Sequence, residues 1–513
     1  MSSSTRTAAL ALLLGAAAAV AIPGGTAAAQ PEPRPECAGT ADFDGDGCTD
    51  MVAGDPTAAV NGQANAGRIN ILYGKGKGSL LVQGASGVPD TAEAGDQFGS
   101  VLQTINLDSD RYSDLVVGVP GEGVGAADDA GSIQVIWGSP DGLGAGRAAV
   151  TLQQGVFGIA GGPEAGDRFG AAMRINRTGG EDGPHPVIAF GAPGEDIGTV
   201  ADAGLAGVVT FDPQTAAVTA TKSIDQTSPG ISGDVEAGDR FGQSVEVFQG
   251  PGGLDCPVTG TNGLTLVVGV PGEDFAGLAD AGMAHVAVNL TGDTLLSQNE
   301  PGVEGTAEAG DQFSASLALD AFCETGPATH VRLAVGTPGE DIGTIANAGM
   351  IHSFLTEDDQ IPLPPRWSAH QDSANVEDVA EAGDRFGSVL TVSDTSRAGG
   401  GGSVLVGIPG EDVGGAADAG AVHALFLDEL TPAPGSDDVF VTAASAGWSV
   451  KNGAHLGASI FGRAGIVVAG APDDAGTGGV LLGLPVASTP VFAVVPGQDG
   501  VPDGAARFGV AVD

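Results

Sequence analysis

The chain has 513 residues, a hydrophobic fraction of 42% and a formal net charge of −45. Such a charge repels nucleic acid and anionic membranes and attracts metal cations and basic partners, so we expect no nucleic-acid partner. Three Trp and two Tyr are too few for the stacking surfaces that bind sugars or single-stranded bases.

Glycine and proline, with 87 and 31 residues, make up about 23% of the chain. This fraction is close to the low-complexity range, but the apolar residues occur in periodic clusters of strand length. The combination favours a turn-rich all-β protein over a disordered one.

Residues 1–29 predict a secretory signal peptide. They contain Arg6, an apolar run over Ala8–Ile22 and three alanines directly before Gln30, which fits an A-x-A cleavage site. The run is short for a membrane span, and no later segment offers about 18 consecutive apolar residues. We therefore expect cleavage near Ala29, no membrane span, and a secreted protein in the extracellular space or at the cell surface.

A Pro-rich leader over residues 30–40 precedes a repeat whose clearest copy is Glu93–Ser139. This copy contains the short apolar runs SVLQTI, DLVVGV and SIQVIWG. The acidic loop NLDSDRYSD and a turn rich in Gly, Pro and Asp separate the runs. Runs of this length, rich in Val and Ile and bounded by turn residues, predict β-strands.

Three signatures recur seven times each along the chain. The first is EAGDxFG, beginning at Glu93, Glu164, Glu236, Glu308 and Glu381, with degenerate copies over 453–457 and 503–509. The second is a strand ending in G-x-P or a close variant, at Pro56, Pro120, Pro193, Pro271, Pro338, Pro409 and Pro472. The third is D/N-A-G before another strand, at Gly67, Gly131, Gly204, Gly282, Gly349, Gly420 and Gly476.

The spacing of these signatures predicts the architecture. Prolines of the second signature lie 63 to 78 residues apart, which leaves room for four strands and their loops in each unit. Seven four-stranded antiparallel units over residues 41–513 make an all-β, seven-bladed β-propeller, in which ring closure hides most sheet edges. Because the first unit lacks its FG strand, we expect residues 507–513 to complete the first blade and close the ring.

The alternating FG and G-x-P signatures, with DxDxDG-type loops between them, resemble the FG-GAP repeats of the integrin α-subunit headpiece and related secreted proteins. The resemblance covers roughly residues 37–513. It implies a seven-bladed propeller whose loops bind calcium and whose work is extracellular adhesion or ligand binding.

The first acidic loop is the strongest candidate metal site. Gly47 permits a sharp turn, so that acidic side chains and a backbone carbonyl can converge on one hard cation. The predicted calcium ligands are Asp42, Asp44, Asp46, Cys48 through its carbonyl, and Asp50. An acidic turn without metal is the alternative.

The second acidic loop keeps the same ligand positions, but Arg111 replaces the glycine of the turn. A less favourable backbone is therefore expected there, with a cation beside the site. The predicted ligands are Asn106, Asp108, Asp110, Tyr112 and Asp114. Equivalent loops of later blades have lost the pattern, so the sequence predicts about two calcium sites, both near the N-terminus.

The PGED and EAGD segments belong to the loops at the rim opposite the metal loops. They bring together Glu164, Asp167, Glu195, Asp196 and Asp202, with counterparts in other blades. One interpretation is that these Asp side chains fix their own turns by accepting backbone N–H bonds. The other is a surface that binds cations or a basic partner.

Cysteine and histidine add less. Sequence position suggests the disulfides Cys37–Cys48 and Cys256–Cys323, while other connectivities and free thiols stay open. His285, His352 and His423 each lie three residues after a D/N-A-G glycine. Because equivalent positions diverge around a ring, we expect these histidines to be structural rather than metal ligands.

Together these patterns predict a secreted, calcium-stabilised, monomeric propeller that acts as an interaction or adhesion module. Its partner would be an unknown extracellular protein or a basic ligand. No catalytic residues are recognised, because a residue repeated in every blade usually serves the fold. The alternatives are a secreted hydrolase or lyase with an active site at one end of the central channel, and a structural component of an envelope or matrix.

Overall fold

A computed structural model describes most of the chain beyond residue 40. The described residues are 41–74, 76–85, 87–176, 185–249, 264–323, 329–357, 363–393, 402–426, 438–463, 466–473, 478–482, 492–494 and 509–512. The chain divides into Met1–Pro35 and Glu36–Asp513, and every described residue belongs to the second unit. The predicted signal peptide and leader lie outside the described residues.

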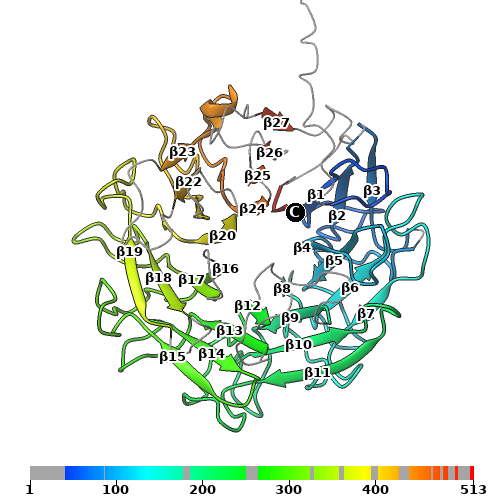
Figure 1. Cartoon of the computed structure of the whole chain (residues 1–513), viewed down its shortest axis with the longest axis horizontal. Helices are drawn as coiled ribbons and strands as arrows, with labels where there is room; N and C mark the ends of the chain where they lie inside the picture. The colour runs from blue at the N-terminus through cyan, green and yellow to red at the C-terminus, as the bar shows by residue number, and fades with distance from the viewer. Residues whose placement is uncertain are drawn as a thin grey trace, which may run out of the picture. The chain divides into compact units, whose positions relative to one another are not determined.

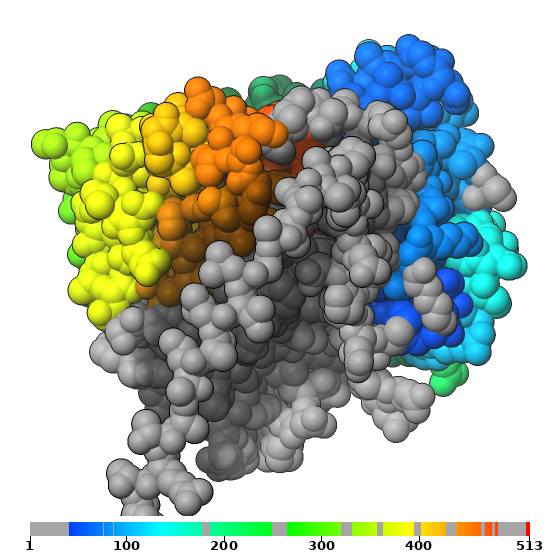
Figure 2. Space-filling view, turned by 90° about the horizontal axis from the view of Figure 1, so that it is seen from above, coloured from blue at the N-terminus to red at the C-terminus, as the bar shows by residue number. Residues whose placement is uncertain are grey.

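The second unit is a ring of seven four-stranded antiparallel sheets, as predicted (Figure 1). Among the described residues, the only helical segment is the short 3-10 turn Ala443–Ala446. No helix in this part of the chain has the length and apolar character needed to cross a bilayer. Figure 2 shows the molecule turned by 90°, with the blue N-terminal blades at the right and the yellow later blades at the left.

Each blade runs from the centre of the ring outward through its four strands. The strands nearest the centre are β28 (Ala511–Val512), β4 (Val101–Ile105), β8 (Ala172–Ile175), β12 (Ser244–Gln249), β16 (Ser316–Cys323), β20 (Val389–Ser393) and β24 (Ser459–Arg463). The second strands are β1 (Met51–Asp55), β5 (Asp114–Val119), β9 (Val187–Ala192), β13 (Leu264–Val270), β17 (Thr329–Thr337), β21 (Ser403–Ile408) and β25 (Ile466–Ala471).

The third strands are β2 (Arg68–Leu72), β6 (Ser132–Ile136), β10 (Leu205–Phe211), β14 (Met283–Val288), β18 (Met350–Glu357), β22 (Ala421–Phe426) and β26 (Gly479–Leu482). The outer strands are β3 (Gly78–Leu81), β7 (Val150–Leu152), β11 (Val218–Ile224), β15 (Asp293–Leu296), β19 (Pro365–Ala369), β23 (Val439–Val441) and β27 (Phe492–Val494).

Burial explains why the middle strands read as continuous apolar runs. Every residue of β5 and β9 is buried, because both faces of a middle strand pack against neighbouring blades. The outer strand β11 is instead partly exposed along its length. The hydrophobic core therefore lies between blades, in clusters that each draw on adjacent sheets.

The D/N-A-G glycine fixes the spacing between blades. Gly131 has a φ of 85° and bridges Phe169 of the next FG segment in parallel register. A Cβ added at Gly131 would lie 2.4 Å from the Phe169 nitrogen, so only glycine fits this position. The Phe169 ring is fully buried, 4.7 Å from the Phe190 ring. The repeated glycine and phenylalanine thus hold successive blades in close contact.

The last strand closes the ring, as the sequence predicts. β28 pairs with β1 through Ala53 opposite Val512 and Gly54 opposite Ala511. The backbone N–H of Gly509 also donates to the carbonyl of Gly54, at 3.1 Å. Residues 507 and 508 of the predicted closing segment lie outside the described residues.

The closing strand yields a stability prediction. Val512 is 7% exposed and packs in an apolar cluster, so Val512→Asp buries an unpaired charge and should destabilise the ring by about 3 kcal/mol or more. Val379 is 61% exposed, and Val379→Asp should change stability by about 0.5 kcal/mol at most. Denaturant unfolding of both variants checks this; equal losses would contradict a closing role for β28.

Candidate metal centre

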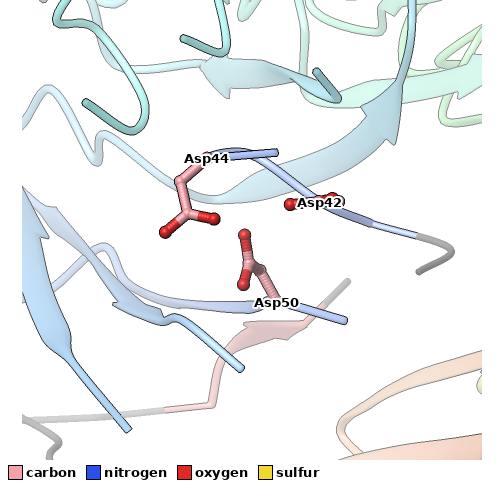
Figure 3. Close-up of side chains that lie close together, drawn as sticks. All are labelled: Asp42, Asp44 and Asp50. Carbon is pink, nitrogen blue, oxygen red and sulfur yellow. The ribbon is translucent and has the colours of Figure 1, made fainter. Parts of the chain in front are cut away.

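Three carboxylates of the first acidic loop converge directly before β1. Oxygen atoms of Asp42, Asp44 and Asp50 all lie within 4.8 Å of one another (Figure 3). Among the described residues, this is the only group of three or more potential Asp, Glu, His or Cys ligands that meets so closely. Carboxylate oxygens are the donors that a hard cation such as calcium prefers.

Backbone donors hold Asp50 at the base of this triad. Its Oδ2 accepts from the Phe43 N–H at 2.7 Å, and its Oδ1 accepts from the Gly74 N–H at 2.8 Å. Burial raises the pKa of Asp50 to about 7; the two backbone bonds oppose this shift, and the charges of Asp44 and Asp42 add to it. The triad is thus a site where negative charge is costly unless a proton or a cation offsets it.

Asp42 and Asp46 also accept hydrogen bonds from the backbone of this loop. Asp42 accepts from the N–H groups of Asp46 and Gly47, at 3.0 and 2.9 Å. Asp46 accepts from the Cys48 N–H at 2.8 Å and lies outside the triad. Three of the four predicted acidic ligands therefore converge, and the fourth stabilises the local backbone.

The second loop keeps the buried aspartate that accepts two backbone N–H bonds, but its carboxylates do not converge. Asp114 takes the part of Asp50: it accepts from the N–H groups of Leu107 and Gly138, at 2.8 and 3.0 Å, and burial raises its pKa to about 7. Asp110 accepts from the Tyr112 N–H at 2.7 Å. Asp108, Asp110 and Asp114 do not meet within the distance that joins the first triad.

Two contacts further distinguish the second loop from the first. The Asn106 side-chain amide donates to the backbone carbonyl of Asp110, and the Arg147 guanidinium lies 3.5 Å from Asp108 Oδ2. The expected backbone cost at Arg111 does not occur, because Arg111 is not among the described residues with positive φ. Ser109, at the position of Gly45 in the first loop, has a φ of 56°, as Gly45 has one of 71°.

The two loops pack against each other. The Asp42 N–H donates to Ser113 Oγ at 3.1 Å, and the Ser113 N–H donates to the Asp42 carbonyl at 2.8 Å. A Cβ added at Gly45 would lie 2.5 Å from the Tyr112 ring. The conformation of the first loop therefore depends on the second.

The repeated acidic segments of the opposite rim divide into buried and exposed residues. Asp167 and Glu195 are 1% and 6% exposed, whereas Glu164, Asp196 and Asp202 are exposed. Asp167 accepts from the Glu164 N–H at 2.6 Å, and Asp196 accepts from the Asp202 N–H at 3.0 Å. The predicted turn-fixing role holds for both aspartates, and the exposed carboxylates form the surface of this rim.

Sequence reasoning missed the partner of the buried glutamate. In five blade junctions a buried glutamine donates through Nε2 to the glutamate of the P-G-E segment. The pairs are Gln83–Glu122, Gln154–Glu195, Gln226–Glu273, Gln298–Glu340 and Gln371–Glu411. The signal was available, because each glutamine precedes the EAGD aspartate by 13 residues.

The histidines occupy three separate sheets, in β14, β18 and β22, and do not converge. His285 and His423 approach Asp293 and Asp438 through Nδ1, at 2.5 and 3.2 Å. Burial lowers the pKa of His352 to about 3, and its Nδ1 lies 2.8 Å from Ser368 Oγ. These buried partners fit the expected structural role.

The central channel contains a hollow of about 270 Å³ lined mainly by the inner strands. Arg174 and Glu246 form an ion pair there, 2.7 Å apart, and most other lining residues are apolar. Within the described lining, no histidine or second acidic residue joins Glu246.

Cysteine pairing stays a prediction. Cys48 is buried, whereas Cys37 and Cys256 lie outside the described residues and the Cys323 side chain is not described.

No protein-family model matches this chain. A stretch of 108 residues is 34% identical to phosphatidylinositol-glycan-specific phospholipase D of Rattus norvegicus, and covers 20% of this chain and 13% of that protein. The Mus musculus protein of the same name is 31% identical over 116 residues, which cover 22% and 14%. The matched stretch thus spans only about one seventh of these relatives.

Among solved structures, that of BBS1N in complex with ARL6DN is 9% identical to this chain, with a TM-score of 0.33, and the match covers 86% and 89% of the two chains.

The buried junction carboxyls predict a pH dependence of stability. Burial raises the pKa of Glu195, Glu273 and Glu340 to about 7, of Glu122 to about 8 and of Glu411 to about 9. Unfolded glutamates titrate near pH ~4.3. Between these pKa values the folded state therefore binds more protons than the unfolded state. The stability of the folded protein should fall as pH rises from about 5 to about 8.

Thermal melts of the chelator-treated protein at pH values across this range provide the measurement. Glu195→Gln, a neutral mimic, should reduce the dependence, whereas Glu300→Gln, at an exposed position, should not. A melting temperature that rises from acidic to alkaline pH would contradict the assignment.

Proposed function

We propose that this protein is a secreted, calcium-stabilised β-propeller that acts as an extracellular interaction module. The observation that carries the proposal is the convergence of Asp42, Asp44 and Asp50. The resemblance of the repeats to FG-GAP sequences supports it.

The chemistry of the triad fits calcium. Three carboxylates provide oxygen ligands only, and backbone N–H bonds orient Asp50. A bound cation would offset the repulsion that helps raise the pKa of Asp50. Asp42, Asp44 and Asp50 would hold the ion, and Asp46 would keep the turn in shape. The second loop is the weaker candidate, because its acids do not meet as closely and Arg147 lies beside Asp108.

Calcium should stabilise the folded protein through this first loop. An ion at 100 times its dissociation constant contributes about 2.7 kcal/mol, so the melting temperature should rise when calcium is added after chelation. Asp44→Asn should lose most of this shift. Asp108→Asn, at the equivalent position of the second loop, should keep it. An unchanged melting temperature of the wild type, or an equal shift in Asp44→Asn, would contradict the proposal.

The partner surface is proposed on the opposite rim, where exposed acids repeat from blade to blade. The exposed glutamate of EAGD recurs as Glu93, Glu164, Glu236, Glu308 and Glu381. The full chain has a net charge of −45, and these exposed acids would attract a basic partner and accelerate its association at low salt. Only the backbone N–H of each glutamate is needed to hold the EAGD turn.

Neutralising these five glutamates tests the surface without disturbing the turns. The five Glu→Gln exchanges together should weaken binding to immobilised polylysine at least tenfold at low salt, and they should not destabilise the protein, because they remove repulsion from the buried aspartates. Asp141→Asn, in the β6–β7 loop of the other rim, should leave binding unaltered. Undiminished binding by the fivefold variant would exclude this rim as the binding surface.

An enzymatic function is the second candidate. Its support is the similarity to proteins named phosphatidylinositol-glycan-specific phospholipase D. We favour the interaction module because the matched stretch covers 13% to 14% of those proteins. In the described lining of the channel, the only acidic residue is Glu246, and it forms an ion pair with Arg174.

A further inference from the structure

The second acidic loop, between β4 and β5, places a cation beside the first acidic loop. A Cβ added at Gly45 would lie 3.3 Å from the Arg111 Nε atom and 2.5 Å from the Tyr112 ring. Gly45 separates Asp44 from Asp46 in the chain, and the Cα atoms of adjacent residues are ~3.8 Å apart. The Arg111 Nε atom therefore lies within roughly 9 Å of the Cα atoms of both aspartates.

Packing of the second loop fixes the position of this cation. The Arg111 guanidinium lies 4.8 Å from the centre of the Tyr112 ring, which is within cation–π distance. Tyr112 is half-buried, and its ring packs against Gly45. The next residue, Ser113, forms two hydrogen bonds with Asp42, at 3.1 and 2.8 Å. Arg111 is therefore held beside the first loop by residues that contact that loop.

The charge of Arg111 is not neutralised by a direct carboxylate partner. Among the described residues Arg111 forms no ion pair, whereas Arg147 lies 3.5 Å from Asp108 Oδ2. Burial raises the pKa of Asp110, and the charge of Arg111 partly opposes that shift. The guanidinium is exposed, so its charge acts on the surrounding carboxylates through space and is open to screening by salt.

The position of Arg111 is also where the two loops differ in sequence. It corresponds to Gly47 of the first loop, which has a φ of 83°. The second loop lacks this glycine, and its acids do not converge. The residue that distinguishes the second loop is thus the residue that reaches the first.

A fixed positive charge affects the first loop in opposite ways with and without metal. Without an ion, it offsets repulsion among Asp42, Asp44 and Asp50, whose charges help raise the pKa of Asp50. When a divalent cation is bound, the same charge repels that cation. For a separation of about 8 Å in water, Coulomb's law with weak screening gives roughly a fourfold effect on affinity.

We propose that Arg111 is a built-in counter-ion of the first acidic loop: it stabilises the metal-free loop and lowers its affinity for calcium. This role rests on the proposed calcium binding by Asp42, Asp44 and Asp50. The second loop then regulates the metal site of the first loop through the charge that it places there. Calcium binding should in consequence depend on ionic strength through one identified residue.

The test is isothermal titration of the chelator-stripped full chain with calcium alone, at about 10 mM salt. Asp44→Asn identifies the titration that belongs to the first loop. Arg111→Gln should tighten this binding about fourfold, because it removes the repelling charge. Arg111→Lys keeps the charge and should stay within about twofold of the wild type. In about 1 M salt, where screening acts over ~3 Å, the difference between Arg111→Gln and the wild type should disappear.

Arg385→Gln is the matched control, because it removes one exposed arginine on the opposite rim and should leave the calcium affinity unchanged. Equal calcium affinity of Arg111→Gln and the wild type at low salt would overturn the counter-ion role and leave the calcium site standing. Tightening by Arg111→Lys as large as that by Arg111→Gln would also overturn it, because the effect would then come from shape and not from charge.

A measurement without calcium tests the other half of the proposal. In chelator at low salt, Arg111→Gln should lower the melting temperature by about 1 °C, whereas Arg111→Lys should not. If the wild type binds no calcium, the proposed function fails, and these melts still decide whether Arg111 acts as a counter-ion. A melting temperature of Arg111→Gln equal to or above that of the wild type would overturn the role.

Discussion

The ring depends on the close approach between the D/N-A-G glycine of one blade and the FG phenylalanine of the next. Cβ atoms added at Gly67, Gly131, Gly204, Gly282 and Gly349 would lie 2.3 to 2.6 Å from backbone atoms of that phenylalanine. These glycines also have positive φ, which other residues adopt only at a cost. The phenylalanine rings at these junctions are fully buried, so the same contact that sets the blade spacing also builds the core.

The junctions then bury acidic groups beside this apolar contact. In five junctions one aspartate and one glutamate are buried, and the glutamate of each EAGD segment remains exposed. A glutamine side chain donates a hydrogen bond to each of these buried glutamates, while burial and like charges raise the pKa of the glutamate. One motif therefore contains buried acids that belong to the junction and exposed acids that are available to the proposed binding surface.

The two acidic loops show how a repeat becomes specialised. Asp50 and Asp114 accept equivalent pairs of backbone N–H bonds, so the anchor belongs to the shared fold. Only the first loop adds two converging carboxylates. The candidate calcium site thus belongs to one corner of the ring, and the second loop supports it through Ser113 and Tyr112.

The sequence by itself determined the seven blades, their four strands and the closing role of the last strand. Strand, turn and repeat signals are local and recur at a regular spacing, so they can be read without coordinates. The tertiary structure decided which acids are buried, because burial depends on the neighbouring blade. It also paired Gln226 with Glu273, 47 residues apart, and brought Arg147 to Asp108, 39 residues apart. The first contact forms when one blade packs on the next, and the second forms when two loops of one blade fold side by side; a local reading of the sequence gives neither.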